Sequence, residues 1–99
     1  DAVKAAALKL NAIIIFKGPD TLIAGPNGHV VINTNAPTWL SVAGAGDVLA
    51  GVVASLIAQG MPAYAASCAG LWFHSEAANS EGKGMIASDL LVSLRDILP

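Results

Sequence analysis

Charged residues are scarce in this sequence. They make up 12% of its 99 residues, whereas apolar residues make up 55%. Ordinary soluble domains carry about 25% charged residues, and a small domain has a high surface-to-volume ratio that calls for more polar surface, not less. The composition therefore predicts part of one larger globular domain, with apolar faces that contact a partner. That partner is the missing part of the same chain, a second subunit, or both.

A long apolar run is also absent. The longest one, Val48 to Ala58, is interrupted by Gly51, and a membrane-spanning helix needs about 20 apolar residues. No charged segment followed by an apolar stretch opens the chain, so no signal peptide is predicted. The net charge is −2 and there is no basic run, which argues against nucleic-acid binding. We expect a protein that neither crosses a membrane nor binds nucleic acid.

Cysteine is nearly absent. Cys68 is the only one, so a disulfide within the chain is excluded and a reducing cytoplasm is the predicted location. No base or cation stands beside Cys68 in the sequence. We therefore interpret it as a small buried apolar residue and not as a reactive thiol.

The apolar pattern that is present predicts an α/β fold. An alanine- and lysine-rich helix leads into Ala12–Phe16, an apolar run rich in β-branched residues that is typical of a strand buried on both faces of a parallel sheet. A hairpin follows, turning at the Gly-Pro-Asn-Gly sequence of residues 25–28. A loop with Pro37 and Trp39 then leads to three helices, the last with Ser88 as candidate N-cap. The predicted helices cover residues 1–10, 46–59, 62–79 and 88–98, and the predicted strands cover 12–16, 21–24 and 29–33.

One glycine-rich turn, Ala43–Asp47, stands directly before the strongest predicted helix. Gly44 and Gly46 allow a close approach of the backbone to a ligand. The first N–H groups of a helix have no partner within it, and the helix dipole adds positive charge there, so the turn suits a phosphate. Asp47 is the one group in the turn that can accept a proton. An anion site beside a general base is what phosphoryl transfer to an alcohol requires.

A simpler interpretation of the same residues is structural. Glycines before a helix often form only a tight turn, and an aspartate in the first helical turn often only complements the dipole. The spacing does not match the dinucleotide fingerprint G-x-G-x-x-G, and the Lys-Ser/Thr ending of a Walker A loop is missing. From spacing alone, the structural and the functional interpretations both stay open.

A family resemblance favours the functional interpretation. The stretch Ala43–Gly60, AGAGDVLAGVVASLIAQG, resembles the anion-hole helix of the ribokinase-like superfamily, and most closely that of the NAD(P)H-hydrate dehydratases. Sugar kinases of this superfamily carry Asp-Thr before the turn and Thr-Phe after its aspartate, and hydroxyethylthiazole kinases carry a cysteine in it; none of these features is present. Further similar stretches lie at Phe16–Thr21, Val31–Trp39, Trp72–His74 and Gly84–Leu91.

The resemblance implies a fold and an activity. Residues 1–99 would be the C-terminal portion of one ribokinase-like three-layer α/β/α domain, and its enzyme would phosphorylate the hydroxyl of hydrated NADH or NADPH and eliminate phosphate. The implied cofactors are ADP or ATP with Mg²⁺, without a complete metal site in this chain. Asp47 would be the base and substrate contact. The implied anion hole is Gly44, Ala45 and Gly46, and the implied nucleotide contacts are Lys17, Gly18, Pro19, Asp20, Thr21 and Gly46.

Two other functions remain as alternatives: a small-molecule kinase of the same fold, of the hydroxymethylpyrimidine or sugar type, and an inactive fragment that only assembles with its missing half. Some residues also keep two interpretations. Lys17 is either a phosphate contact or a solvated charge, and Trp39 lines a pocket or packs the loop. We interpret His74 as a hydrogen-bonded packing residue, since no second metal ligand stands at a suitable spacing.

Overall fold

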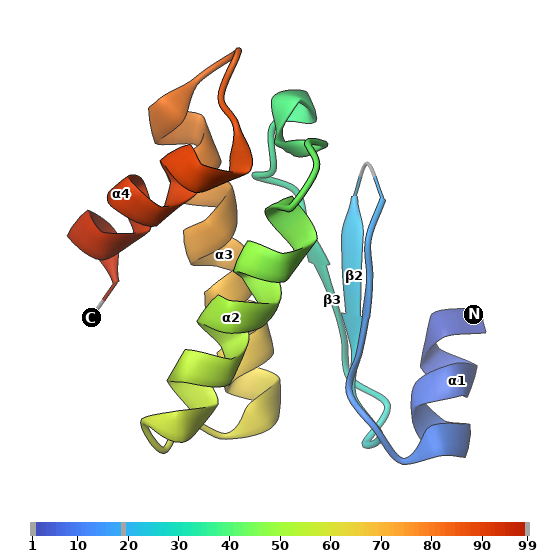
Figure 1. Ribbon diagram of the computed structural model, residues 1–99. Coiled ribbons are helices and arrows are strands. Elements are labelled where there is room, and N and C mark those ends of the chain that lie inside the picture. The colour runs from blue at the N-terminus through green and yellow to red at the C-terminus, as the bar shows by residue number, and fades with distance from the viewer. Residues whose placement is uncertain (1, 19, 99) are drawn as a thin grey trace.

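The computed structural model describes residues 2–18 and 20–98 and has three layers. Helix α1 covers one face of a small sheet, α2 and α3 cover the other face, and α4 packs on the outer side of α3 (Figure 1). The elements, in chain order, are α1 (Ala2–Leu10), β1 (Ile14–Phe16), β2 (Thr21–Ala24), β3 (Val30–Asn33), a 3₁₀ turn (Thr38–Leu40), α2 (Ala45–Ala58), α3 (Ala63–Glu81) and α4 (Ala87–Ile97).

The sheet has the order β1-β2-β3, and both strand pairs are antiparallel. The predicted turn at residues 25–28 is confirmed: Gly25 N–H donates to the His29 carbonyl at 2.9 Å, and Gly28 takes a φ of 88° that favours glycine. The prediction of a parallel strand buried on both faces is wrong for the part of the chain that the structure describes. Strand β1 lies at the edge of the sheet, with no described strand beyond it, and Phe16 is therefore 57% exposed.

Two local predictions are corrected at helix ends. The loop before α2 contains a 3₁₀ turn. Within it, the indole N–H of Trp39 donates a 2.9 Å hydrogen bond to the Ala78 carbonyl of α3. This bond supports the interpretation that Trp39 packs the loop against α3. Ser88 lies inside α4 and is not its N-cap. The carboxylate of Asp89 instead accepts a hydrogen bond from the N–H of Ile86 at 2.9 Å, which satisfies one of the free donors at the helix start.

Close contact between α2 and α3 forms the centre of the helical layer. A β-carbon on Gly70 would lie only 2.8 Å from Cγ2 of Val53, so glycine is needed where α3 passes α2. Ile23 of the sheet packs between the two helices with Leu49 and Leu71. The sheet and both helices are thereby joined in one apolar contact, next to the start of α2.

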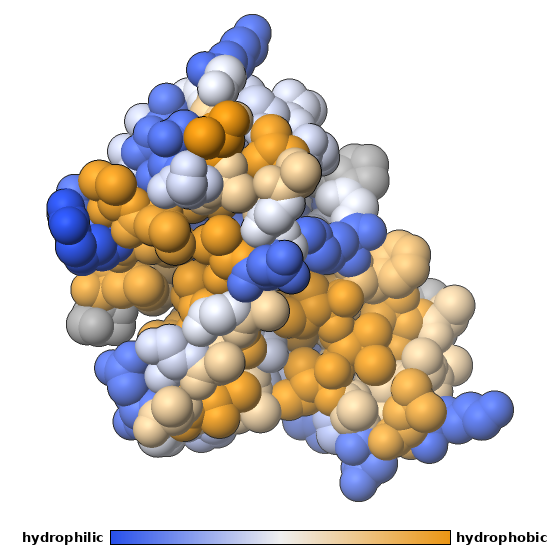
Figure 2. Space-filling model, in the orientation of Figure 1, coloured by the Kyte–Doolittle hydropathy of each residue, from blue (hydrophilic) through white to orange (hydrophobic). Residues whose placement is uncertain are grey.

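Large apolar side chains remain exposed over much of the surface. Figure 2 shows an apolar strip that extends between the sheet and α2. A groove in this region is lined mainly by apolar side chains: Ile15, Leu49, Ala50, Val53, Ala54 and Ile57. Such continuous apolar surface agrees with the composition. None of the described helices has the length and hydropathy needed to span a membrane.

Replacing Gly70 with alanine should destabilise the fold. The added methyl group would overlap Val53, and we expect the free energy of unfolding to fall by about 1–3 kcal/mol. The control is Gly51→Ala, because this position of α2 is exposed and a β-carbon there would meet no atom within 4 Å beyond the neighbouring helical backbone. It should raise stability by about 0.5–1 kcal/mol. Urea denaturation of both variants tests this, and equal stability of the two would contradict the proposed helix contact.

Candidate functional site

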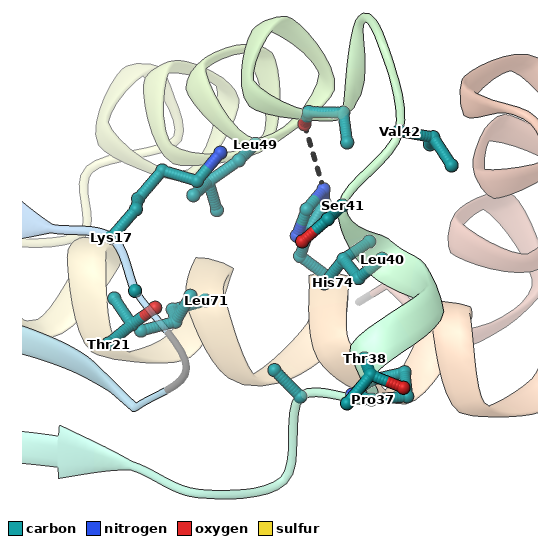
Figure 3. Close-up of a pocket in the computed structure, with 13 residues that line it drawn as sticks. Lys17, Thr21, Pro37, Thr38, Leu40, Ser41, Val42, Leu49, Leu71 and His74 are labelled. Carbon is teal, nitrogen blue, oxygen red and sulfur yellow. Dashed lines mark hydrogen bonds between the residues drawn. The ribbon is translucent and has the colours of Figure 1, made fainter.

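A cavity of about 480 Å³ opens beside the first turn of α2 (Figure 3). Lys17 and Thr21 border it from the ends of β1 and β2, and Ser41 borders it from the loop before α2. Ala45, the first residue of α2, and His74 of α3 complete its polar part. Five separate segments of the chain thus meet at the glycine-rich turn: β1, β2, the loop before α2, α2 itself and α3.

The start of α2 has free hydrogen-bond donors. Gly44 has a φ of 87°, a conformation that suits glycine, and as the N-cap residue it has no side chain that accepts a hydrogen bond. The N–H of Ala45 donates to Val42 and that of Val48 to Gly44, each at 3.2 Å. Among the described residues no group accepts a hydrogen bond from the N–H of Gly46 or Asp47. These two donors are available to an anion.

The ammonium group of Lys17 lies at the same place. A β-carbon on Gly46 would be 3.1 Å from Lys17 Nζ, so the absence of a side chain at Gly46 lets the lysine approach the helix. Within the described residues the one ion pair joins Arg95 to Asp96, and no carboxylate neutralises Lys17. A cation beside the positive end of a helix dipole is unfavourable without an anion between them. The geometry therefore suits a phosphate group.

The predicted site residues do not all gather in this cavity. Lys17, Gly18, Thr21 and Ala45 line it, and Gly44 and Gly46 form the adjoining turn. Asp20 is exposed and does not border the cavity, and Pro19 lies outside the described residues. Asp47 is exposed on another side of α2, where it borders a groove shared with Leu94 and Arg95 of α4.

His74 has a larger role in the site than the sequence indicates. It is buried and hydrogen-bonded, as predicted: its Nε2 lies 2.9 Å from the carbonyl oxygen of Ala45. Burial lowers the pKa of His74; the bond to Ala45 opposes this, and the charge of Lys17 adds to it. The ring is therefore neutral at pH 7. Its contact with the cavity depends on how α3 packs on α2, which no local pattern reveals. Ser41 also borders the cavity, and no sequence motif indicates that it does.

No cluster of three or more histidine, cysteine, aspartate or glutamate residues that could hold a metal ion is found in residues 2–18 and 20–98. A Mg²⁺ ion bound with a nucleotide takes most of its ligands from phosphate oxygens and water. The free N–H groups and Lys17 fit those phosphates.

The sequence matches the family model Carb_kinase, described as NAD(P)H-hydrate dehydratase, over residues 1–99. The chain belongs to the NAD(P)H-hydrate dehydratase family. The ADP-dependent (S)-NAD(P)H-hydrate dehydratase of Neisseria meningitidis is 40% identical over 88 residues, which are 87% of this chain and 30% of the relative. The bifunctional NAD(P)H-hydrate repair enzyme Nnr of Moorella thermoacetica is 39% identical over 98 residues, 94% of this chain and 18% of the relative. The chain thus spans less than a third of the length of either dehydratase relative.

Solved structures agree with the family at the level of the fold. The ADP/ATP-dependent NAD(P)H-hydrate dehydratase of Bacillus subtilis, co-crystallized with ATP and Mg²⁺, superimposes with a TM-score of 0.88 at 24% identity. The superposition covers 96% of this chain and 36% of that one. It confirms the α/β fold class that the dehydratase resemblance implied.

Alanine at Gly46 should weaken anion binding in this dehydratase-family chain. Its methyl group would lie 3.1 Å from Nζ and push the lysine away from the free N–H groups. We expect the dissociation constant for inorganic pyrophosphate to rise about tenfold, or 1.4 kcal/mol, when it is measured by calorimetry at low salt. Gly51→Ala, farther along α2, is the matched control and should leave this constant unchanged. Unaltered binding in Gly46→Ala would show that Lys17 and the turn do not share one anion.

Proposed function

We propose that this chain carries the phosphate-binding part of an enzyme that dehydrates hydrated NADH or NADPH back to NAD(P)H with ADP or ATP. One observation carries the proposal: the Lys17 ammonium, which has no carboxylate partner among the described residues, lies beside Gly46 in the turn where the N–H groups of Gly46 and Asp47 are free. Membership of the dehydratase family supplies the substrate class. The names of the relatives, an ADP-dependent dehydratase and repair enzymes, agree with it.

The chemistry explains why a phosphate site serves a dehydration. Hydroxide is a poor leaving group, whereas phosphate is a good one. The substrate hydroxyl loses its proton to a base as its oxygen bonds to the terminal phosphorus of the nucleotide, and the shortened nucleotide leaves. The C–O bond then breaks with the electron pair leaving on phosphate, and loss of a proton from the neighbouring ring carbon restores the double bond.

We assign the base and the substrate contact to Asp47. Support comes from its place in the first turn of α2, one residue after Gly46. Asp47 and Lys17 border different hollows on different sides of that turn. In phosphoryl transfer the attacking and leaving oxygens lie roughly in line on opposite sides of phosphorus. A phosphoryl group held at the end of α2 would have the acceptor toward Asp47 and the nucleotide toward Lys17.

The nucleotide would occupy the Lys17 side of the turn. Its predicted contacts are Gly46 and the segment after β1: Lys17, Gly18, Pro19, Asp20 and Thr21. The predicted anion hole beside them is Gly44, Ala45 and Gly46. Lys17, Gly18 and Thr21 border the cavity, which supports this assignment. Bound Mg²⁺ would neutralise charge on the phosphates. ADP and ATP both remain candidates, since the names of the relatives include each.

The remainder of the active site would come from outside these residues. We infer that residues 1–99 are the C-terminal portion of one domain, and that the apolar strip between the sheet and α2 pairs with the missing portion or with a second copy. The exposed groove lined by Ile15, Val53 and Ile57 supports this pairing. The lone Cys68 supports our prediction of a reducing cytoplasm.

The test uses the full-length protein with hydrated NADH and Mg²⁺, and follows NADH absorbance with ADP, with ATP and without nucleotide. We expect recovery only with a nucleotide. In Asp47→Asn the rate should fall about 10²- to 10⁴-fold, because an amide cannot act as the general base. Asp96→Asn, an exposed carboxylate on α4, is the control and should retain the rate. No recovery with either nucleotide would instead direct the search to hydroxymethylpyrimidine and sugar substrates.

A further inference from the structure

No side chain caps the first turn of α2, and Gly44 and Gly46 add no side chain that could contact its backbone. Among the described residues, one side chain makes a hydrogen bond to this turn: His74, through Nε2 to the Ala45 carbonyl at 2.9 Å. Both the ring and this bond are buried, where water does not compete. The bond therefore restrains the turn strongly.

The Ala45 carbonyl and the Gly46 N–H belong to the same peptide unit. The peptide bond is planar, and none of the described bonds is cis. In a trans peptide the carbonyl and the N–H point in opposite directions. A group that holds the carbonyl oxygen of Ala45 therefore also sets the direction of the Gly46 N–H, one of the two donors left free for an anion.

The state of the ring follows from its surroundings. A carbonyl oxygen can only accept a hydrogen bond, so Nε2 of His74 must carry the proton. Nδ1 is buried and has no partner among the described residues, and no acceptor is present there for a second ring proton. The nearby Lys17 ammonium also disfavours a charged ring. His74 is thus a neutral donor with one fixed tautomer.

We propose that His74 is a positioning residue of the phosphate site: its Nε2–H holds the Ala45–Gly46 peptide so that the Gly46 N–H points at the bound anion. The ligand class is a nucleoside diphosphate or triphosphate, so the inference rests on the proposed function. The ring acts through Ala45 and does not need to touch the nucleotide. Figure 3 shows the arrangement: His74 extends from α3 to the first turn of α2, beside the cavity that Lys17 borders.

Two substitutions separate positioning from packing. In His74→Gln the side-chain amide can place an N–H near the position of Nε2 and keep the bond to Ala45. His74→Leu fills similar space but has no donor. We expect the dissociation constant for ADP, measured by calorimetry on the full-length protein, to rise about tenfold in His74→Leu and less than about threefold in His74→Gln. Rescue by glutamine is the result that a purely structural role would not produce.

Ser75→Ala is the matched control. Ser75 is the next residue on α3 and is fully buried; its hydroxyl donates to the Leu71 carbonyl and accepts from the Asn33 amide. It does not border the cavity. Ser75→Ala should lower the melting temperature and leave ADP affinity unchanged. Equal ADP affinity in wild type, His74→Leu and Ser75→Ala would overturn the positioning role, whatever their melting temperatures.

Nitrogen NMR of the histidine side chains gives a readout that does not depend on affinity. The His74 ring should show protonated Nε2 and unprotonated Nδ1 at neutral pH. A proton on Nδ1 of His74 would overturn the inference. Wild type that binds ADP but does not restore NADH would overturn the proposed function alone. Wild type that fails to bind ADP would contradict both.

Discussion

Gly70 has no side chain at the point where α3 passes α2, and the site depends on the close helix contact that this permits. Val53 occupies the space that a β-carbon would take. With the two axes this close, His74, one turn after Gly70, comes within hydrogen-bond distance of the first carbonyl of α2. The same helix pair receives Ile23 of the sheet between Leu49 and Leu71. Packing in the core thus positions polar groups at the end of α2.

The second constraint is electrostatic. With 12% charged residues, the chain has few groups that could neutralise one another. Lys17 nevertheless lies against the positive end of α2, with no described carboxylate as its partner. Lysine at a strand end usually extends into water, and the missing side chain at Gly46 leaves room for the contact here. The cavity presents the Lys17 ammonium group and the adjoining turn presents free N–H groups, which together favour a ligand with negative charge.

The sequence predicts the local features of the site better than their arrangement. The Gly44–Asp47 turn, the hairpin glycines and the helices are local patterns, and they were found within one or two residues of their true bounds. The prediction that β1 is a central, fully buried strand is wrong. An apolar run indicates that a strand is buried but not which segments bury it, and within the described residues β1 lies at the edge of the sheet. The residue type of Ser88 predicts a helix cap, but Asp89, one position later, accepts the hydrogen bond from the Ile86 N–H. The role of His74 depends on a contact between residues 29 apart, which no periodicity encodes.

The apolar strip and the cavity at the start of α2 share part of their boundary. Lys17 and Leu49 border both the cavity at the start of α2 and the groove between the sheet and α2. Whatever covers the groove therefore also meets the Lys17 side chain and narrows the space available to its ammonium group. Covering the groove would remove water from around this charge, and a charge interacts more strongly with a phosphate where water is excluded. An assembly that covers the groove would thus be coupled, through the same two residues, to the binding of an anion in the cavity.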